Sequence, residues 1–485
     1  MSQLPMGWIE QKIKNINERK SATINPAHFP DETFELFSVP IFPTGNAELL
    51  QGKEIGSTKQ LVEAGDVLLC KINPRINRVW VVTEPKGFRQ IASSEWIVIS
   101  SSVHDSDFLK YYFRENKFRG LLCSDVSGVG GSLTRAKPKL VNEYNVIVAP
   151  LAEQTRIVEK LDEVLAQVDT IKARLDGIPA ILKRFRQSVL AAAVSGKLTE
   201  EWRGGNAHRK PELASFAKYW EKEYSLSGRK YSQPNISHDK RANLCLPDNW
   251  LDTCIGNVFD VHVGATPSRK ESIYWNGDIP WVSSGEVAFS FISDTAEKIT
   301  ESGLSNSSTK LHPKGTVMLA MIGQGKTRGQ PAILRIEAAH NQNTAAMRVP
   351  EGMCISEFLY YYLWEKYEET RRVGSGNNQK ALNKSAVQHL HFPCPPYEEQ
   401  KEIVRLVDQY FAFADTIEAL VKKAQARVDK LTQSILAKAF RGELVPQDPN
   451  DEPADKLLER IATARKEAEA LAKAAKKAGR KKVTA

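Results

Sequence analysis

The chain has 485 residues, of which 41% are hydrophobic and 26% are charged. At roughly 100–200 residues per domain, this length and composition indicate a globular protein of about two to four domains. No stretch approaches the roughly 18–20 consecutive apolar residues of a membrane helix, and the N-terminus lacks the layout of a signal peptide. We therefore expect a cytoplasmic protein with no membrane partner.

The six cysteines form no C-x-x-C pair, which argues against a zinc ribbon and against a disulfide framework. We expect unpaired thiols in a reducing compartment and no metal site.

The net charge is +9, but it is unevenly distributed. Residues 454–485 contain ten Lys or Arg and four Asp or Glu, a surplus of six, so the other 453 residues carry only +3. A protein that binds DNA unaided over a large footprint usually has a stronger basic surplus. If this chain reads DNA, we expect a partner to supply part of the grip on the phosphates.

An internal repeat organises the chain. Residues 150–198 align without gaps on residues 396–444, and 19 of the 49 positions are identical. Three shorter matches lie upstream of these two regions: L-P-M-G-W at 4–8 with L-P-D-N-W at 246–250, G-D-V-L-L-C-K-I at 65–72 with G-T-V-M-L-A-M-I at 315–322, and D-F-L-K-Y-Y-F at 107–113 with E-F-L-Y-Y-Y-L at 357–363. A unit that occurs twice predicts pseudo-two-fold symmetry rather than a solenoid.

Both copies of the strong repeat have apolar residues at alternating steps of four and three. The first set is Ile157, Leu161, Val164, Val168, Ile171, Leu175, Ile178, Leu182, Phe185, Val189 and Ala192. The second set is Ile403, Val407, Tyr410, Ala414, Ile417, Val421, Ala424, Val428, Leu431 and Ile435. This spacing predicts two coiled-coil helices that pack on each other, each about 54 Å long over its heptads. Pro179 should kink the first helix.

The rest of the chain shows mixed α/β patterning, with short β-rich runs such as 79–83 and 95–100. The predicted divisions are a first module at 1–150, a spacer helix at 151–198, a polar linker at 199–245 with a short helix near Leu213–Tyr224, a second module at 246–395, a spacer helix at 396–445 and a basic, alanine-rich tail at 446–485. The tail continues the heptad step mostly with alanine, which buries little area, so we expect it to need a partner groove.

This layout resembles the specificity (S) subunits of type I restriction–modification enzymes, over the entire chain. The most specific motifs are P-L-A-E-Q with the helix that follows it, the second copy of that helix, and G-A-T-P-S-R-K followed by Y-W-N-G-D-I-P-W-V-S-S-G-E within 264–286. The first helical region is similar especially to the enteric, K-type branch of the family.

The resemblance implies an α+β fold in which two mixed α/β target-recognition domains are separated by two long helices that form an antiparallel intramolecular coiled coil. It implies a non-catalytic subunit that reads a bipartite target in double-stranded DNA. Two modification subunits would methylate adenine with S-adenosylmethionine, and two restriction subunits would add the ATP- and Mg-dependent motor nuclease. The chain itself would bind no cofactor.

The sequence lacks the motifs of an adenine methyltransferase. Asn73-Pro74-Arg75 has neither the second proline nor the aromatic residue of an N-P-P-[FY] loop, and S-G-V-G-G-S at 127–132 does not follow the dinucleotide-binding pattern. Residues 320–327 fit a relaxed P-loop pattern, but Arg328-Gly-Gln-Pro and another strand-like run follow them where a P-loop needs a helix. This stretch favours a β-hairpin with a basic tip.

Candidate DNA contacts are polar residues that pair with base edges or phosphates. In the first module they are Lys71, Asn73, Arg75, Asn77, Arg78, Arg135 and Lys137. In the second module they are Thr266, Ser268, Arg269, Lys270, Gln324, Lys326, Thr327, Arg328, Arg371, Arg372, Asn377, Asn378, Gln379 and Lys380. Trp275 and Trp281 are interpreted as core residues rather than base-stacking platforms.

Two alternatives differ in class from DNA recognition. One is a nucleotide hydrolase that uses Gly325–Thr327, which the missing helix disfavours. The other is a coiled-coil scaffold that does not bind DNA, which leaves unexplained why the modules diverged while the helices stayed alike.

Overall fold

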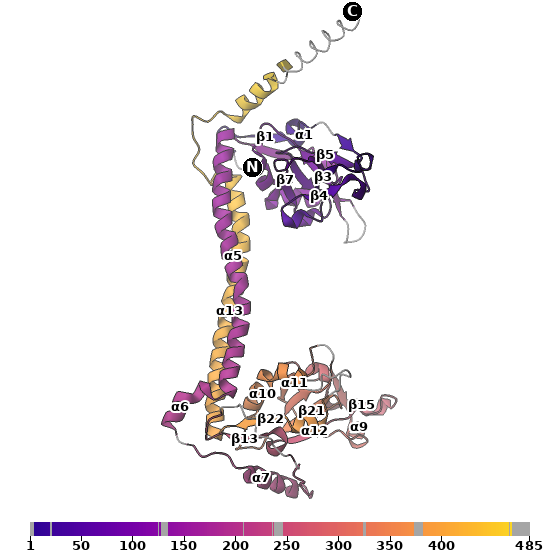
Figure 1. The fold of residues 1–485 in the computed structure, drawn as a ribbon, viewed down its shortest axis with the longest axis vertical. Coiled ribbons are helices and arrows are strands. Elements are labelled where there is room, and N and C mark those ends of the chain that lie inside the picture. Colours follow the sequence, from indigo (N-terminus) through magenta and orange to yellow (C-terminus); the bar gives the residue numbers. More distant parts are fainter. Residues whose placement is uncertain are drawn as a thin grey trace, which may run out of the picture. The chain divides into compact units, whose positions relative to one another are not determined.

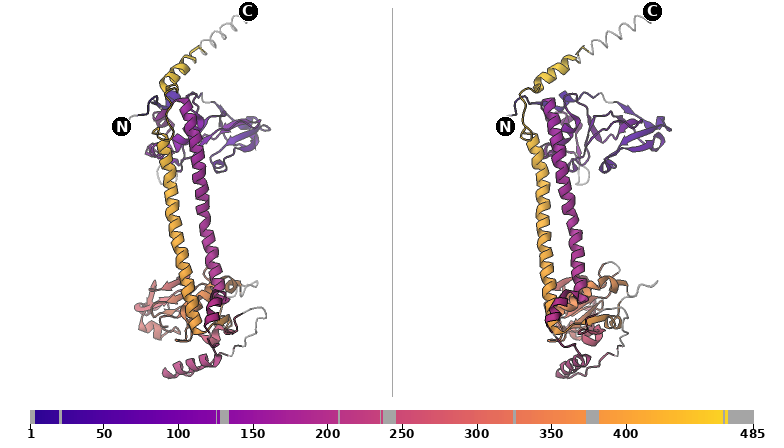
Figure 2. Two further views of the ribbon diagram at one scale, coloured as in Figure 1. Left: turned by 90° about the vertical axis from the view of Figure 1, so that its left-hand side faces the viewer. Right: turned by 60° about the vertical axis from the view of Figure 1, so that its left-hand side comes forward.

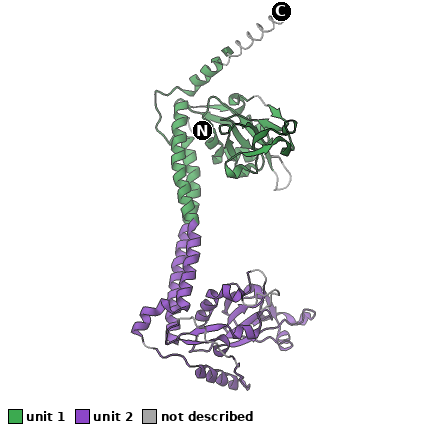
Figure 3. Cartoon of the chain, viewed as in Figure 1, with its two compact units in different colours: residues 1–176, 422–485 green, residues 177–421 purple. Residues whose placement is uncertain are grey.

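The computed structural model describes residues 4–19, 22–124, 126–127, 134–206, 208–234, 236, 246–323, 326–372, 382–464 and 466–467. The chain divides into two compact units, unit 1 (residues 1–176 and 422–485) and unit 2 (residues 177–421) (Figure 3). Each unit contains one α/β module together with part of two long helices. These helices are α5 (Leu151–Val194) and α13 (Tyr397–Ala439).

Helices α5 and α13 lie side by side in each unit and run antiparallel (Figures 1 and 2). In unit 1 the Lys172 ammonium is 3.0 Å from Asp429 and the Gln425 amide donates to Asp176 at 2.7 Å, so residue numbers fall on α13 as they rise on α5. In unit 2 the Arg186 guanidinium contacts Asp415 at 2.5 Å and Glu418 at 3.1 Å. The packing of the two helices on each other, predicted from the heptads, and their antiparallel arrangement, implied by the family resemblance, are both confirmed.

The heptad seam is less completely buried than the sequence predicted. Positions next to the modules, such as Ile157 and Ile403, are fully buried, whereas Ile171 and Leu431 are each 46% exposed. Two helices alone enclose a side chain less well than a module and a helix together, which explains the difference. Helix α5 continues through Pro179 without ending there.

The first module contains two larger sheets, ordered β2-β5-β8-β3-β4 and β7-β6-β9, and two strand pairs, β1-β12 and β10-β11. Its strands are β1 (Ile9–Lys12), β2 (Thr23–Ile24), β3 (Thr33–Phe37), β4 (Glu48–Gln51), β5 (Lys59–Leu61), β6 (Val67–Cys70), β7 (Val79–Val81), β8 (Arg89–Ala92), β9 (Trp96–Ile99), β10 (Val126–Ser127), β11 (Arg135–Ala136) and β12 (Asn145–Val148). Its helices are α1 (Ile13–Ile16), α2 (Ser106–Arg114), α3 (Asn116–Ser124) and α4 (Pro138–Val141).

The second module contains sheets ordered β14-β21-β18-β19-β16 and β17-β15-β20, and the pair β13-β22. Its strands are β13 (Leu251–Cys254), β14 (Asp260–Val263), β15 (Trp275–Val282), β16 (Ser290–Ile292), β17 (Glu297–Ile299), β18 (Val317–Ala320), β19 (Pro331–Leu334), β20 (Ala339–His340), β21 (Thr344–Arg348) and β22 (His391–Cys394). Its helices are α8 (Ile255–Val258), α9 (Glu301–Ser305), α10 (Ser356–Glu365), α11 (Tyr367–Arg372) and α12 (Lys384–Gln388).

A common core underlies the two modules although their outer strands differ. Strand β6 pairs antiparallel with β7 and β9, and β18 pairs in the same way with β19 and β21. The helix that follows is anchored identically, because the Ser106 hydroxyl donates to Gly65 O and the Ser356 hydroxyl donates to Gly315 O, each at 2.6 Å. The faint sequence matches upstream of the helices therefore mark one folding unit used twice.

A buried glutamine joins each module to its long helix. The Gln154 amide group donates to Val103 O (3.0 Å) and Ala149 O (2.8 Å), and its oxygen accepts from Asp105 N (2.8 Å). Gln400 repeats this pattern, donating to Met353 O (3.3 Å) and Pro395 O (2.9 Å) and accepting from Ile355 N (2.9 Å). A buried side chain whose polar atoms are all satisfied fixes its surroundings, so these two residues lock the modules onto the helices.

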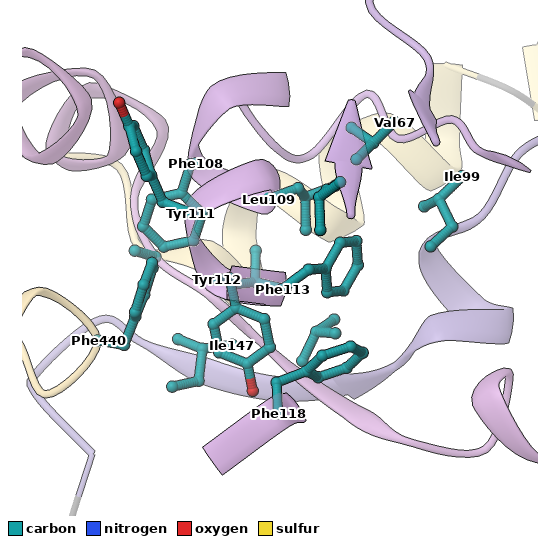
Figure 4. Close-up of a cluster of buried hydrophobic side chains, with 14 of the residues drawn as sticks. Val67, Ile99, Phe108, Leu109, Tyr111, Tyr112, Phe113, Phe118, Ile147 and Phe440 are labelled. Carbon is teal, nitrogen blue, oxygen red and sulfur yellow. The ribbon is translucent and has the colours of Figure 1, made fainter. Parts of the chain in front are cut away.

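Each module also contacts the C-terminal end of the second long helix in its unit, which is α13 in unit 1 and α5 in unit 2. Gly442, just beyond α13, has φ +71°, and an added Cβ would lie 2.4 Å from Pro5; Gly196, beyond α5, has φ +77° and would meet Pro247 at 2.5 Å. In unit 1 the Phe440 ring also packs against Phe108 and Tyr112 in the module core (Figure 4). The L-P-x-x-W motifs thus mark where each module receives a helix end.

Two segments differ from the sequence-based expectation. In the polar linker, the short helix predicted near Leu213–Tyr224 is confirmed as α7 (Leu213–Leu226), but α7 also buries Phe216 and Trp220 against the second module, and an additional helix, α6 (Glu200–Gly205), precedes it. In the tail, Leu457 is buried in the core of unit 1 and Ile461 packs against that core. The first turns of the tail therefore have their apolar partner within the chain; the tail beyond residue 467 lies outside the described residues.

Candidate nucleic-acid interface

The turn between β6 and β7 holds most of the first module's candidates. Its short 3-10 helix η4 (Pro74–Ile76) is flanked by Asn73 (φ 46°) and Asn77 (φ 53°), both in the left-handed region that asparagine tolerates better than most residues. Asn73 N donates to Thr134 O at 2.8 Å, and the Asn73 side-chain oxygen accepts from Thr134 N at 3.3 Å. The Asn77 amide group donates to Arg114 O at 3.2 Å. Both asparagines therefore hold the turn.

Several cations near this turn already have partners. Glu95 lies 3.9 Å from the Lys71 ammonium and 3.2 Å from the Arg135 guanidinium, and Ala136 N donates to Lys71 O at 2.9 Å. The structure thus brings residues 71–78 and 135–137 onto one surface. The Arg78 guanidinium lies 3.9 Å from the Cys70 sulfur. Burial raises the pKa of the Cys70 thiol, and the neighbouring Arg78 opposes that rise.

Arg75 and Lys137 complete this surface. Both are exposed, and neither forms an ion pair among the described residues. Arg75 lies at the centre of the turn, where its guanidinium is a cation without an ion pair among the described residues.

In the second module the candidates gather at one end of the five-stranded sheet. Ala265 N donates to His340 O at 3.0 Å, and the Thr266 hydroxyl donates to Gln342 at 2.5 Å. Met321, at the base of the β18–β19 turn, donates its N–H to Asn343 O at 2.9 Å. The segment that precedes β21 therefore connects the loop after β14 with the β18–β19 turn.

Arg269 is held within the module. Its guanidinium pairs with Glu297 through two contacts, one of 2.8 Å. The central carbon of the guanidinium lies 3.7 Å from the Trp275 ring centroid. Trp281 is buried and packs edge-on against Trp275, so the interpretation of these tryptophans as packing residues fits their surroundings. Ser268 and Lys270 remain exposed beside them.

The β18–β19 turn is tied to α11. The Tyr367 hydroxyl donates to Lys326 O at 2.5 Å and accepts from the Arg371 guanidinium at 3.1 Å, and the Arg328 guanidinium donates to Arg371 O. The side chains of Lys326 and Arg372 are exposed, without ion pairs among the described residues. Gln324, Asn377, Asn378, Gln379 and Lys380 lie outside the described residues.

The turn is a hairpin and not a P-loop. Strand β18 pairs antiparallel with β19, and Gly329 N donates to Ala320 O at 2.8 Å across the turn. A P-loop would run into a helix whose N-terminus holds the phosphate, and here a strand follows. Among the described residues no group of His, Cys, Asp or Glu has the arrangement of a metal site, and no helix there could span a bilayer.

Sequence reasoning missed Glu95, Gln342 and Tyr367, which act by orienting the candidates. Tyr367 had a usable signal, because it precedes Arg371 by four residues and side chains at that spacing are neighbours on a helix. Glu95 and Gln342 meet their partners only through tertiary contacts, and nothing in the local sequence marks them.

Comparisons with known proteins point to one family. The family model described as "Type I restriction modification DNA specificity domain" matches residues 247–426. The chain is 35% identical over 354 residues to the specificity subunit of the Escherichia coli type I restriction enzyme EcoBI, covering 69% of this chain and 66% of that protein. It is 31% identical over 392 residues to the EcoKI specificity subunit of E. coli K12, covering 78% and 74%.

A solved structure extends the likeness to the fold. The crystal structure of the HsdS subunit from Thermoanaerobacter tengcongensis superimposes with a TM-score of 0.59, covering 91% of this chain and 98% of that one at 20% identity.

Proposed function

The chain belongs to the family of type I restriction enzyme specificity subunits, and on this basis we propose that each module reads one half of a bipartite target in double-stranded DNA. Its resemblance to the enteric, K-type branch is confirmed by the match to the EcoKI subunit. The chain is a recognition subunit and not an enzyme, since catalysis in such systems resides in the partner subunits.

The observation that carries the proposal is a hairpin tip that occurs once in each module at the same place in the sheet. The β6–β7 turn presents Arg75 and the β18–β19 turn presents Lys326, each exposed and without an ion pair among the described residues. Arginine and lysine pair with guanine edges in the major groove and with phosphates anywhere along the duplex. Two such tips suit two half-sites.

We assign the paired helices to the docking of two modification subunits. Large apolar side chains lie exposed on these helices: Ile171 and Leu431 in unit 1, and Ile181, Phe413 and Leu420 in unit 2. Exposed apolar side chains gathered on one element are typical of a protein-binding surface. The two restriction subunits would join through the modification subunits.

The helices also set the gap between the half-sites. Helix α5 has 44 residues, so it is about 66 Å long at 1.5 Å per residue. Four residues inserted in each helix would lengthen the pair by about 6 Å. The gap in the target should then grow by one or two base pairs at the roughly 3.4 Å spacing of stacked bases, with both half-sites unchanged; an altered half-site with an unchanged gap would contradict this role.

The chemistry belongs to the partners in this proposal. The modification subunits use S-adenosylmethionine to methylate adenine, and the restriction subunits use ATP and Mg²⁺ to move and cut DNA in the cytoplasm. The chain supplies none of these sites, and with +3 outside its tail it also relies on the partners for part of the phosphate contacts.

Mapping of methylated adenines by single-molecule sequencing tests the proposal. Cells that carry the chain with its modification subunits should show one new motif made of two unrelated halves with a fixed gap. A continuous motif, or no new methylation while the complex assembles, would overturn the proposal.

A further inference from the structure

Each hairpin tip is hydrogen-bonded to a helix of its own module, α2 in the first module and α11 in the second. In the second module the Tyr367 hydroxyl bonds to the backbone oxygen of Lys326 itself, at 2.5 Å. The Tyr367 ring also lies against Gly329, where an added Cβ would meet ring and backbone atoms at 3.4 Å. One side chain therefore contacts the turn on both sides of Arg328.

Tyr367 is itself held in place by an aromatic residue in a strained conformation. The Phe289 ring packs against Tyr367 and against Trp364, each with centroids 5.1 Å apart. Phe289 has φ 53°, a region that bulky residues rarely adopt, and its N–H donates to Pro331 O at 2.9 Å. Such strain persists only where the surroundings impose it. The packing of Phe289 thus fixes the position of the Tyr367 ring.

The first module achieves the same fastening with a different residue. Asn77 follows Arg75 by two positions, and its side chain bonds to Arg114 O at the end of α2. The left-handed conformation of Asn77 turns the chain back towards β7. In both modules, then, a side-chain hydrogen bond joins the tip to a helix end, and in the second module the Arg328 guanidinium adds another, to Arg371 O.

We propose that Tyr367 and Asn77 are positioning residues for base recognition, which hold Lys326 and Arg75 in the orientation that discriminates one base from another. This inference rests on the proposed function and assigns to each half-site the residue that controls its selectivity. Neither residue needs to touch DNA.

The reason lies in the different geometric demands of the two kinds of contact. A phosphate contact tolerates a displaced cation, because charge attraction falls off slowly with distance. A hydrogen bond to a base edge needs a donor within a few tenths of an ångström and near linearity. Loosening a tip should therefore reduce base discrimination more than overall affinity.

Tyr367→Phe tests the second module, with Tyr360→Phe as a matched control. Tyr360 belongs to the same aromatic cluster, but its hydroxyl has no hydrogen bond among the described residues. The chain is assembled with its modification subunits, and its target is selected from a random duplex library. Losing the hydroxyl's hydrogen bonds should reduce discrimination about three- to tenfold at the half-site of the second module, with discrimination at the other half-site unchanged.

A double-mutant cycle identifies the residue through which Tyr367 acts. If Tyr367 positions Lys326, then Tyr367→Phe should have little further effect once Lys326→Ala has been made. Additive losses, or equal losses at both half-sites, would show that Tyr367 has only a structural role and would overturn the inference.

Asn77→Gly tests the first module, since glycine keeps the left-handed backbone and removes the bond to Arg114 O. Asn276→Gly is its control, because Asn276 has φ 62° and no side-chain hydrogen bond among the described residues. Selectivity should fall only at the half-site of the first module. If wild type selects a bipartite target and neither Tyr367→Phe nor Asn77→Gly changes it, the inference fails alone; if wild type selects no bipartite target, the proposed function fails with it.

Discussion

Gln154 in the first module and Gln400 in the second occupy the same place at the start of a long helix, and each makes the same three hydrogen bonds. The glutamates that directly precede them in the sequence, Glu153 and Glu399, accept hydrogen bonds from different groups. Glu153 accepts from the Trp8 indole at 2.8 Å, whereas Glu399 accepts from Thr199 (2.8 Å), Arg203 (2.6 Å) and Asn249 (3.2 Å).

The difference shows which part of the joint is constrained. Trp250 corresponds to Trp8 but its indole N–H has no partner among the described residues, since α6 brings Arg203 to Glu399 instead. Burial raises the pKa of the Glu153 carboxyl, and the Trp8 N–H opposes that rise. The hydrogen bonds of the glutamine to the backbone are therefore repeated, while the donors to the buried carboxylate differ: an indole N–H in the first module, and a hydroxyl, a guanidinium and an amide in the second.

The largest effect should come from breaking the charged joint. Arg203→Ala leaves the fully buried Glu399 without its cation, which should cost about 3–5 kcal/mol of unfolding free energy. Trp8→Phe in the other joint removes one hydrogen bond to a carboxylate and should cost about 1.5–3 kcal/mol. Denaturant unfolding of the chain measures the loss of unfolding free energy in each variant. Equal losses in Arg203→Ala and Trp8→Phe would contradict the difference between the two joints.

Replacing the buried glutamines should have a smaller and matched effect. Gln154→Leu and Gln400→Leu each leave two backbone carbonyls and one N–H without a partner, at a cost of about 2–3 kcal/mol. Hydrogen exchange should show faster exchange around residues 103–105 in the first variant and around residues 353–355 in the second. Exchange that stays slow in either region would refute the locking role.

Acid should destabilise the second module more than the first. Burial lowers the pKa of His340 and of His104 to about 4. Burial, and then the charges of His340, His262, Arg348 and Lys310, lower the pKa of His312 to about 2. A histidine held neutral in the folded state stabilises it fully above the unfolded pKa of about 6.5, and that stability is lost as the pH falls towards the folded value.

Two such histidines lie in the second module and one in the first, so lowering the pH from 7.5 to 5.5 should reduce their unfolding free energies by about 3 and about 1 kcal/mol. Hydrogen exchange at pH 7.5 and pH 5.5, corrected for the intrinsic rate, measures each module within the same chain. A larger loss in the first module would contradict these assignments.

The smallest effect should come from the tip cations. Arg75→Ala and Lys326→Ala each remove one cation that we propose contacts DNA, so the salt slope of binding should fall by about one unit if the contact is to a phosphate. A change in preferred bases at one half-site would identify a base contact instead. Titrations of the assembled complex from about 50 to 200 mM salt separate the two outcomes, and an unchanged slope and preference would remove the residue from the interface.

The arrangement of two modules and two long helices was predictable from the sequence, because the chain contains an internal repeat. The heptads predicted spacer helices at 151–198 and 396–445, and the structure has them at Leu151–Val194 and Tyr397–Ala439, shorter by four and six residues at their C-terminal ends. The G-D-V-L-L-C-K-I and G-T-V-M-L-A-M-I matches, found as repeats, contain the equivalent strands β6 and β18. The β18–β19 hairpin followed from the absence of a helix after Thr327.

The side-chain assignments were less predictable, because they depend on contacts between distant segments. Asn73, Asn77 and Arg328 are polar residues in turns, as DNA contacts often are, yet their side chains bond to the module itself. Which cation stays free depends on the position of Glu95 and Glu297, more than 15 residues away in the chain. The packing of α7 on the second module was not predicted, because polar residues precede and follow this helix in the sequence.

Exchange of residues 1–150 for the equivalent module of another family member tests the central claim most directly. Methylated adenines are mapped in cells that carry the wild-type or the exchanged chain together with the modification subunits. If the two modules read DNA independently, one half of the motif is replaced by that of the donor, while the other half and the gap stay the same. If both halves change together, or if neither changes, the modules do not read separate half-sites and the account is wrong.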